Sequence, residues 1–210
     1  MSTRSGLLGR NRVQVFILAA VAYLPLLAND VGRVAADTKA YLYLDPGRLL
    51  ARAPYMWQPE VAMGTVTHQN IGYLWPVGPF FWLGETVGLP DWITQRLWMG
   101  SVLLAAGLGM RWFLRTLGWR GAAMLVSSLA YMLSPYLLNY MDRHSVILLP
   151  WAGLPWLMGL TVRALRTQGW RHAAIFGLVA LTIGGVNASS LLLVGIGPVA
   201  WLAWCALEGS

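Results

Sequence analysis

Charged side chains are scarce in this chain of 210 residues. Asp, Glu, Lys and Arg make up 11% of the residues, whereas apolar types make up 57%. Soluble domains contain about 25% charged and about 45–50% apolar residues. A soluble surface needs those charges, so their scarcity predicts an integral membrane protein. The net charge of +7 would suggest a nucleic-acid partner for a soluble protein. In a membrane protein the placement of the positive charges along the chain matters instead, and we expect no nucleic-acid partner.

Cysteine is nearly absent as well. The single cysteine, Cys205, lies in an apolar run, so the chain can build neither a disulfide framework nor a zinc site. The sequence also lacks a His/Cys/carboxylate set at metal-ligand spacing, a glycine-rich phosphate loop entering a helix, and a Ser-His-Asp set. We therefore predict no cofactor and no metal ligands, while a divalent metal requirement stays open.

Long apolar runs dominate what is present. A spanning helix needs about 20 mostly apolar residues. The run from Ala173 to Leu207 carries no charge and would be roughly 50 Å long as one helix, well beyond a bilayer core of about 30 Å. Glycines and an amide in Gly184-Gly185-Val186-Asn187 predict a fold into two spans there. The predicted fold is an all-α integral membrane bundle with spans at about 13–28, 97–114, 121–140, 146–162, 173–186 and 190–207.

The charges divide between two sets of connections. Three segments hold only arginine, and every acid except Glu208 falls in the alternate segments. Excess Lys and Arg mark cytoplasmic loops, so we predict a multi-pass plasma-membrane protein with a cytoplasmic N-terminus. The arginine-only segments hold Arg4, Arg10 and Arg12, then Arg111, Arg115 and Arg120, then Arg163, Arg166 and Arg171.

The N-terminus has a rival interpretation as a cleaved signal peptide, because Val34-Ala35-Ala36 is a weak A-x-A-like site after a basic and an apolar region. Ala36 lies several residues beyond the end of that apolar region, however, across Asp30 and Arg33. This distance favours a membrane anchor.

The first outer loop, Asn29 to Gln95, is the longest connection and is rich in Trp, Tyr and Pro. Such a composition is not typical of disorder, and loops of this length are usually functional when they are ordered. Its segment Ile71–Gly88 is apolar, but Pro76 and Pro79 would break a continuous helix. We predict that it lies on or dips into the outer leaflet as short interfacial helices.

Two acids in this loop, Asp37 and Asp45, follow the first span closely. Asp37 could act as a general base at the outer membrane face, or it could cap a short helix running toward Pro46. Spacing alone favours the cap. Asp45, directly before Pro46, is typical of a turn or cap, and Asp30 is predicted to be an interfacial group at the end of the first helix.

Cationic and polar groups elsewhere outside the membrane could meet a sugar phosphate. Arg143 and His144 lie in the short outer loop NYMDRHS, where Arg can bind phosphate through its fork; the alternative is that Asp142 pairs with Arg143 in water. Lys39, Arg48 and Arg52 are further candidates, although anionic headgroups alone would attract them. His68 and Gln69, in TVTHQN, would suit sugar hydroxyls but also fit ordinary loop polarity.

The outer loop resembles that of a known family. The resemblance runs over most of residues 29–160 and rests on five features of the loop and on the later ILLPWAGLPWL (Ile147–Leu157). The five features are Asp37-Thr38-Lys39; Asp45-Pro46; Arg52-Ala53 with Trp57; Gly72-Tyr73 with Pro76, Gly78 and Phe80-Phe81; and Gln95-Arg96-Leu97-Trp98. In these features the chain is similar to the actinobacterial α-(1→3)-arabinofuranosyltransferases of the D type, which belong to the GT-C glycosyltransferases. Two departures are the apolar AYLYL after Lys39 and a length far below that of family members, which predicts a fragment.

This resemblance implies a GT-C bundle with a long first periplasmic loop and an active site on the outer face. It implies Asp37 as general base, with an arabinan as acceptor and decaprenyl-phosphate arabinofuranose as donor. Lys39, Arg143 and His144 are candidates for the donor phosphate, and His68 and Gln69 for the acceptor sugar. Rival hypotheses are another polyprenyl-phosphate-sugar transferase, for example a mannosyltransferase, and a non-catalytic subunit or lipid-glycan transporter.

Overall fold

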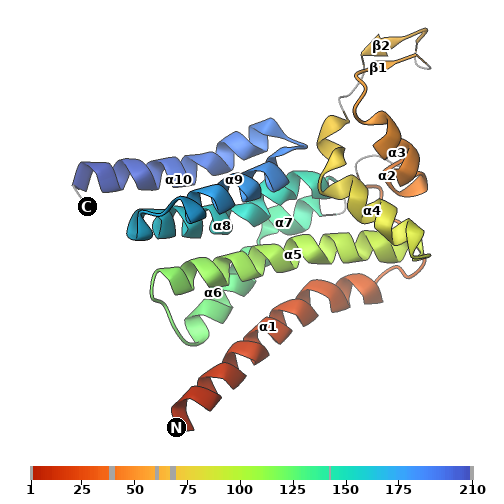
Figure 1. Ribbon diagram of the computed structural model, residues 1–210. Coiled ribbons are helices and arrows are strands. Elements are labelled where there is room, and N and C mark those ends of the chain that lie inside the picture. Colours follow the sequence, from red (N-terminus) through yellow and green to blue (C-terminus); the bar gives the residue numbers. More distant parts are fainter. Residues whose placement is uncertain (1, 38–40, 60–61, 67–69, 142, 209–210) are drawn as a thin grey trace.

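The computed structural model describes residues 2–37, 41–59, 62–66, 70–141 and 143–208, with side chains from residue 11 onward except that of residue 41. Six long or moderately long helices and a group of short elements make up this part of the chain (Figure 1). In chain order the elements are α1 (Ser2–Ala28), α2 (Tyr41–Leu44), α3 (Pro46–Arg52), β1 (Trp57–Gln58), β2 (Thr65–Val66), η1 (Ile71–Leu74), α4 (Val77–Thr86), α5 (Asp91–Thr116), α6 (Ala122–Met132), α7 (Pro135–Tyr140), η2 (Ser145–Ile147), α8 (Leu148–Thr167), α9 (Trp170–Gly184) and α10 (Ala188–Glu208).

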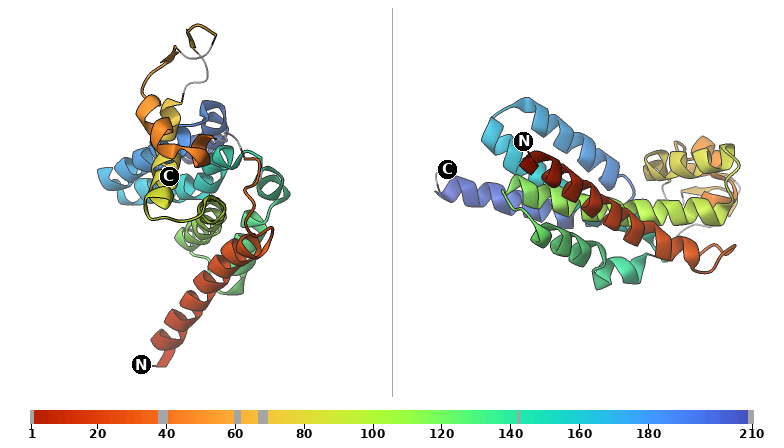
Figure 2. Two further views of the ribbon diagram at one scale, coloured as in Figure 1. Left: turned by 90° about the vertical axis from the view of Figure 1, so that its right-hand side faces the viewer. Right: turned by 90° about the horizontal axis from the view of Figure 1, so that it is seen from below.

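The bundle is organised around α5. This helix packs against α1, α6 and α8, and α8 in turn packs against α9 and α10 (Figure 2). Five helical stretches are long and apolar enough to cross a membrane: Asn11–Ala28, Asp91–Thr116, Ala122–Tyr140, Ser145–Thr167 and Ala188–Glu208. The remaining predicted span, 173–186, coincides with α9, whose 15 residues extend over only about 22 Å. The all-α membrane bundle predicted from the apolar runs is confirmed.

The turn between α9 and α10 lies where the sequence predicts it. α9 ends at Gly184 and α10 begins at Ala188. The side-chain oxygen of Asn187 accepts a hydrogen bond of 2.9 Å from the backbone N–H of Ser190. An amide in this position satisfies one of the free N–H groups at a helix start, which explains why the uncharged run folds back here.

The helix boundaries differ from the predicted spans at two places. α5 begins at Asp91, six residues before the predicted start at Leu97, because Pro90 precedes it and an acid occupies its first turn. The predicted span 121–140 is two helices, α6 and α7. Ser134 caps α7 through a hydrogen bond from the N–H of Leu137, and Pro135 occupies its first position. A proline lacks the N–H that a continuous helix would need there.

Small residues let α5 and α8 approach closely. Trp112 of α5 and Trp156 of α8 stack with their ring centroids 5.5 Å apart. Each ring lies over a glycine of the opposite helix, Gly159 under Trp112 and Gly109 under Trp156. Membrane helices lack a strong hydrophobic driving force for association, so such close packing supplies much of the contact energy.

The short elements of the outer loop gather at one end of the bundle, and the β1–β2 hairpin projects away from it (Figure 1). Asp45 caps α3, accepting a hydrogen bond of 2.9 Å from the N–H of Arg48, which confirms its predicted role. The loop also touches the far side of the bundle, because Trp75 donates a hydrogen bond of 3.1 Å to Thr182 of α9.

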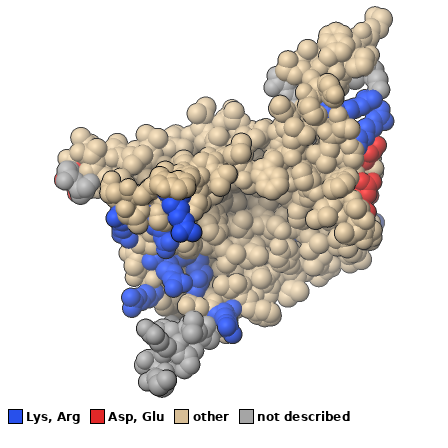
Figure 3. All heavy atoms as spheres, in the orientation of Figure 1, with Lys and Arg blue, Asp and Glu red and all other residues tan. Residues whose placement is uncertain are grey.

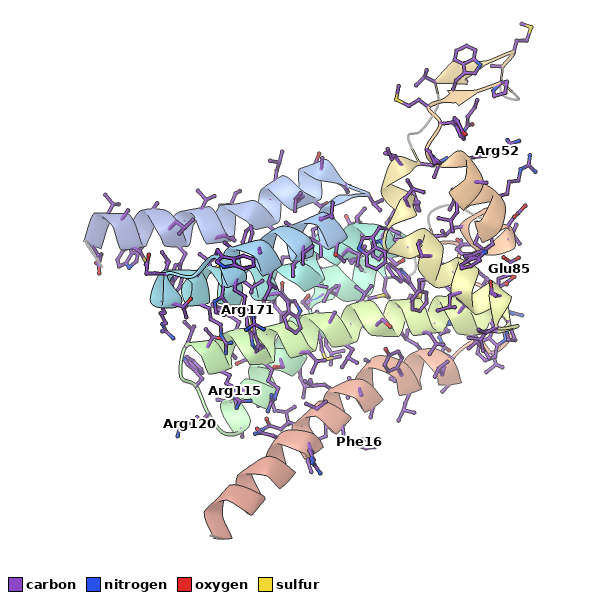
Figure 4. All side chains as sticks on the ribbon, viewed as in Figure 1. Phe16, Arg52, Glu85, Arg115, Arg120 and Arg171 are labelled. Atoms are coloured by element: carbon purple, nitrogen blue, oxygen red, sulfur yellow. The ribbon has the colours of Figure 1, made fainter. Side chains whose placement is uncertain are left out.

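The charges segregate to the two ends of the bundle. Lys and Arg alone gather at one end of the face seen in Figure 3, and the patch of acids lies at the other end. Figure 4 places Arg115, Arg120 and Arg171 together at the first end, while Arg52 and Glu85 lie at the second. The short loop elements and the end of α1 belong to this second end.

Candidate active site

Asp37 is buried, with 2% of its surface exposed. Its Oδ1 atom accepts a hydrogen bond of 2.8 Å from the backbone N–H of Ser145, and its Oδ2 atom accepts one from the Ser145 hydroxyl. Ser145 is the first residue of η2, which leads directly into α8. The carboxylate therefore meets the N–H of a helix start 108 residues away in the chain.

The backbone before Asp37 is held by Gln95 of α5. This side chain is completely buried, and its amide forms two hydrogen bonds with Ala35. Gln95 Oε1 accepts from the N–H of Ala35 at 2.7 Å, and Gln95 Nε2 donates to the carbonyl of Ala35 at 2.9 Å. The Gln95 side chain thus satisfies both the N–H and the carbonyl of Ala35, as a neighbouring strand would. These two hydrogen bonds orient the segment that leads to Asp37.

Tyr43 of α2 also contacts this segment. Its hydroxyl donates a hydrogen bond to the carbonyl of Asp37. Burial, together with the nearby Asp37 carboxylate, raises the pKa of Tyr43 to about 12. The phenol is therefore neutral at physiological pH and acts as a hydrogen-bond donor.

A cavity of about 400 Å³ opens beside this segment. Among the described residues its lining contains three arginines and one acid, an excess of two positive charges. The lining residues are Asp30, Arg33, Val34, Ala35, Ala36, Arg96 and Arg143. We refer to it as the arginine cavity. Its wall includes the three residues that directly precede Asp37.

Arg96 is the most buried arginine of this cavity, with 7% of its surface exposed. Its Nη2 atom donates to the carbonyl of Arg33 at 3.4 Å, whereas its Nε atom has no partner among the described residues. Within that part of the chain, none of the three cavity arginines forms an ion pair with a carboxylate. A buried guanidinium normally has an anionic partner, so the cavity has the charge and donors to receive an anion.

The predicted site residues fall into three groups. Asp37 and Arg143 lie at the site, Arg143 as an exposed member of the cavity lining. His144 is exposed, and the described lining does not include it. Lys39, His68 and Gln69 lie outside the described residues. So does Asp142, so the alternative of an Asp142–Arg143 pair stays untested.

Sequence reasoning did not single out several residues that surround Asp37. Gln95, Arg96 and Trp98 belong to the QRLW motif, which supported the family resemblance and marked the start of a span, but none of the three was predicted as a site residue. Arg33 and Ser145 carried no signal beyond their outer location. Among the described residues, no group of three or more His, Cys, Asp or Glu could hold a metal ion.

Comparison with known proteins identifies the family. Residues 21–209 match the family described as alpha-(1->3)-arabinofuranosyltransferase, N-terminal GT-C domain. The chain belongs to this family. It is 35% identical over 192 residues to the alpha-(1->3)-arabinofuranosyltransferase of Mycobacterium tuberculosis, and 35% identical over 191 residues to that of Mycolicibacterium smegmatis. Each alignment covers 89% of this chain.

Solved structures of the same family share the fold. The cryo-EM structure of arabinofuranosyltransferase AftD from Mycobacteria superimposes with a TM-score of 0.83 at 33% identity, over 91% of this chain. The chain spans only 14% and 13% of the length of the two curated relatives and 15% of that solved chain. The GT-C fold is therefore shown for this N-terminal domain.

Proposed function

We propose that this chain is the catalytic N-terminal part of a membrane α-(1→3)-arabinofuranosyltransferase, which transfers arabinofuranose from decaprenyl-phosphate arabinofuranose to a cell-wall arabinan. The observation that carries the proposal is the buried carboxylate of Asp37, which in the chain directly follows three residues that line the arginine cavity. Membership of a family described as arabinofuranosyltransferases supports the reaction class.

Asp37 is proposed as the general base. Hydrogen bonds reach both of its oxygens, an arrangement suited to an ionised carboxylate, which has about four acceptor sites. The attacking hydroxyl of the acceptor gives its proton to Asp37 while its oxygen bonds to the anomeric carbon of the donor. The bond from that carbon to the phosphate oxygen breaks at the same time. Attack from the face opposite the phosphate inverts the β configuration of the donor to an α linkage.

The arginine cavity is proposed to hold the donor phosphate. As decaprenyl phosphate leaves, negative charge grows on its bridging oxygen, and preorganised cations stabilise that charge. The cations of this cavity are Arg33, Arg96 and Arg143, and their guanidinium groups match the geometry of phosphate. Lys39 and His144 belong to the same proposal by charge and sequence proximity, and His68 and Gln69 remain the proposed acceptor contacts.

The site is proposed to face the periplasm. Arg115, Arg120 and Arg171 gather at the end of the bundle opposite the outer loop, and cytoplasmic loops are the ones enriched in arginine. With the N-terminus in the cytoplasm, Asp37 and the arginine cavity lie at the outer membrane face. A lipid-linked donor in the outer leaflet would present its sugar at that level.

The decisive experiment compares Asp37→Asn with Asp45→Asn in the full-length protein, assayed in membranes with decaprenyl-phosphate arabinofuranose. Asp37→Asn should lower the transfer rate at least about a hundredfold, since asparagine cannot accept the proton. Asp45→Asn makes the same chemical change on an exposed residue and keeps helix capping, because Asn caps as well as Asp does. It should retain the wild-type rate.

Wild-type transfer by Asp37→Asn would refute the assignment of the base. If the wild-type protein transferred mannose but no arabinose from the corresponding polyprenyl-phosphate donors, the sugar assignment would be wrong. If it moved intact lipid-linked sugar across vesicles without transfer, the transporter hypothesis would replace the enzyme.

A further inference from the structure

Trp98 of α5 lies behind the Asp37–Ser145 contact. Its indole Nε1 atom donates a hydrogen bond of 3.0 Å to the Ser145 hydroxyl, which in turn contacts Asp37 Oδ2. The three side chains come from the loop after α1, from α5 and from the start of η2. They form a continuous hydrogen-bonded chain, which we call the tryptophan–serine chain.

The chemistry of these groups determines which group donates each hydrogen bond in the tryptophan–serine chain. An indole N–H can only donate, so the Ser145 oxygen accepts from Trp98. The serine hydroxyl has a single hydrogen, which is therefore directed at Asp37 Oδ2. Without Trp98 that hydroxyl could rotate toward another acceptor. The indole thus commits Ser145 to the role of donor toward the carboxylate.

Packing holds both members of the chain in place. Ser145 is completely buried and Trp98 is 4% exposed. The indole of Trp98 packs against Phe80 and Phe81 of α4, with ring centroids 5.3 and 6.2 Å apart. In a packed interior side chains occupy single rotamers, so the hydroxyl and the carboxylate have one relative orientation.

We propose that Ser145 and Trp98 are positioning residues that orient the Asp37 carboxylate for proton abstraction. This inference rests on the proposed function, because it assumes that Asp37 is the base. The Ser145 N–H holds Oδ1, and the tryptophan–serine chain holds Oδ2, so the carboxylate plane cannot turn about its own bond. Catalytic groups need such orientation to within small angles.

The test uses Ser145→Ala, Ser145→Thr, Trp98→Phe and the Ser145→Ala/Trp98→Phe double variant in the full-length protein. Ser145→Ala removes the hydroxyl and keeps the N–H, so kcat should fall about tenfold or more, as expected for a hydrogen bond to a charged group. The donor KM should stay within about twofold, because the change affects the reacting step alone. Ser145→Thr restores the hydroxyl and should recover most of kcat.

Trp98→Phe should lower kcat by a smaller factor than Ser145→Ala does. The Ser145 hydroxyl remains, but without the indole donor it is no longer held toward Asp37 Oδ2. The double variant should be no slower than Ser145→Ala, because both changes interrupt the same chain.

Ser128→Ala is the matched control: Ser128 is also completely buried, but its hydroxyl bonds to the carbonyl of Met124 within α6. It should keep the wild-type kcat.

A wild-type kcat for Ser145→Ala, or a loss in donor KM alone, would overturn the inference. Additive losses in the double variant would also overturn it, since they would mean that the two residues act separately. If Ser145→Ala fails to fold, Trp98→Phe decides, and an unchanged kcat there rejects the role of the chain. An active Asp37→Asn variant would instead refute the proposed function itself, so the two failures are distinguishable.

Discussion

At the scale of single residues, Asp37 and Asp45 make different contacts. Asp45 caps α3, the helix that directly follows it. Asp37 also meets a helix-start N–H, but that N–H belongs to Ser145, at the beginning of η2. The sequence posed cap and base as alternatives for Asp37. The structure shows that Ser145 donates to both oxygens of this carboxylate, and the role of general base is our proposal.

Arg143 offers a residue-scale test of the phosphate site. Arg143→Ala should raise the donor KM about tenfold, because a guanidinium–phosphate contact is charge-assisted. The effect on kcat should be smaller. Arg120→Ala removes the same charge at the opposite end of the bundle and should leave the donor KM unchanged. Kinetics with varied lipid-linked donor measure both, and an unaltered donor KM for Arg143→Ala would remove it from the site.

At the scale of elements, the outer loop is fastened to the bundle at several points. Gln95 of α5 holds the segment before Asp37, and η1 lies directly on the turn between α9 and α10. A Cβ atom on Gly72 would lie 2.0 Å from the carbonyl oxygen of Gly185. Only glycine allows this approach of two backbones. The hydrogen bond from Trp75 to Thr182 reinforces the same contact.

Gly72→Ala should therefore destabilise the domain by about 1–3 kcal/mol, the usual range for overpacking. Neither backbone can yield as a flexible side chain would. Gly177→Ala is the control, because a Cβ on that α9 residue meets nothing within 4 Å. Alanine should be neutral or slightly stabilising in a helix. Thermal unfolding in detergent measures the difference, and equal midpoints for the two variants would contradict the close contact.

At the scale of the whole molecule, charge separates the two ends of the bundle. Arg115, Arg120 and Arg171 lie at the end opposite the one that holds Glu85 and the patch of acids (Figures 3 and 4). Moving arginine-rich loops across a bilayer is costly, so this separation predicts which end stays in the cytoplasm. It also predicts that the arginine cavity and Asp37 share the outer side.

Thiol labelling of the 210-residue chain tests this orientation, because Cys205 is its single cysteine. In a Cys205→Ser background, Asp45→Cys should react with a membrane-impermeant maleimide in intact spheroplasts. Arg120→Cys should react only after the membrane is permeabilised. The reverse pattern would invert the topology and place the proposed site in the cytoplasm.

Local signals account for most of what the sequence predicted about the fold. Apolar runs mark the helices, and Asn187 and Asp45 each precede a helix and accept a hydrogen bond from the N–H three positions later. The division of α6 from α7 was also encoded locally, in Ser134 and Pro135. Apolar residues continue on both sides of Ser134 and Pro135, so hydropathy alone does not reveal this break. The extension of α5 to Asp91 was missed because its first turns are polar and lie outside the apolar run.

The sequence by itself therefore determined a membrane bundle, the turn between α9 and α10 and the sign of charge at each end, because these depend on each residue and its near neighbours. Only the tertiary structure brought the residues of the candidate site together. Asp37 meets Ser145, and the arginine cavity joins Arg33, Arg96 and Arg143, because α1, α5 and the start of η2 converge at one end of the bundle. Contacts across a hundred residues depend on how helices pack, and neither hydropathy nor spacing records that geometry.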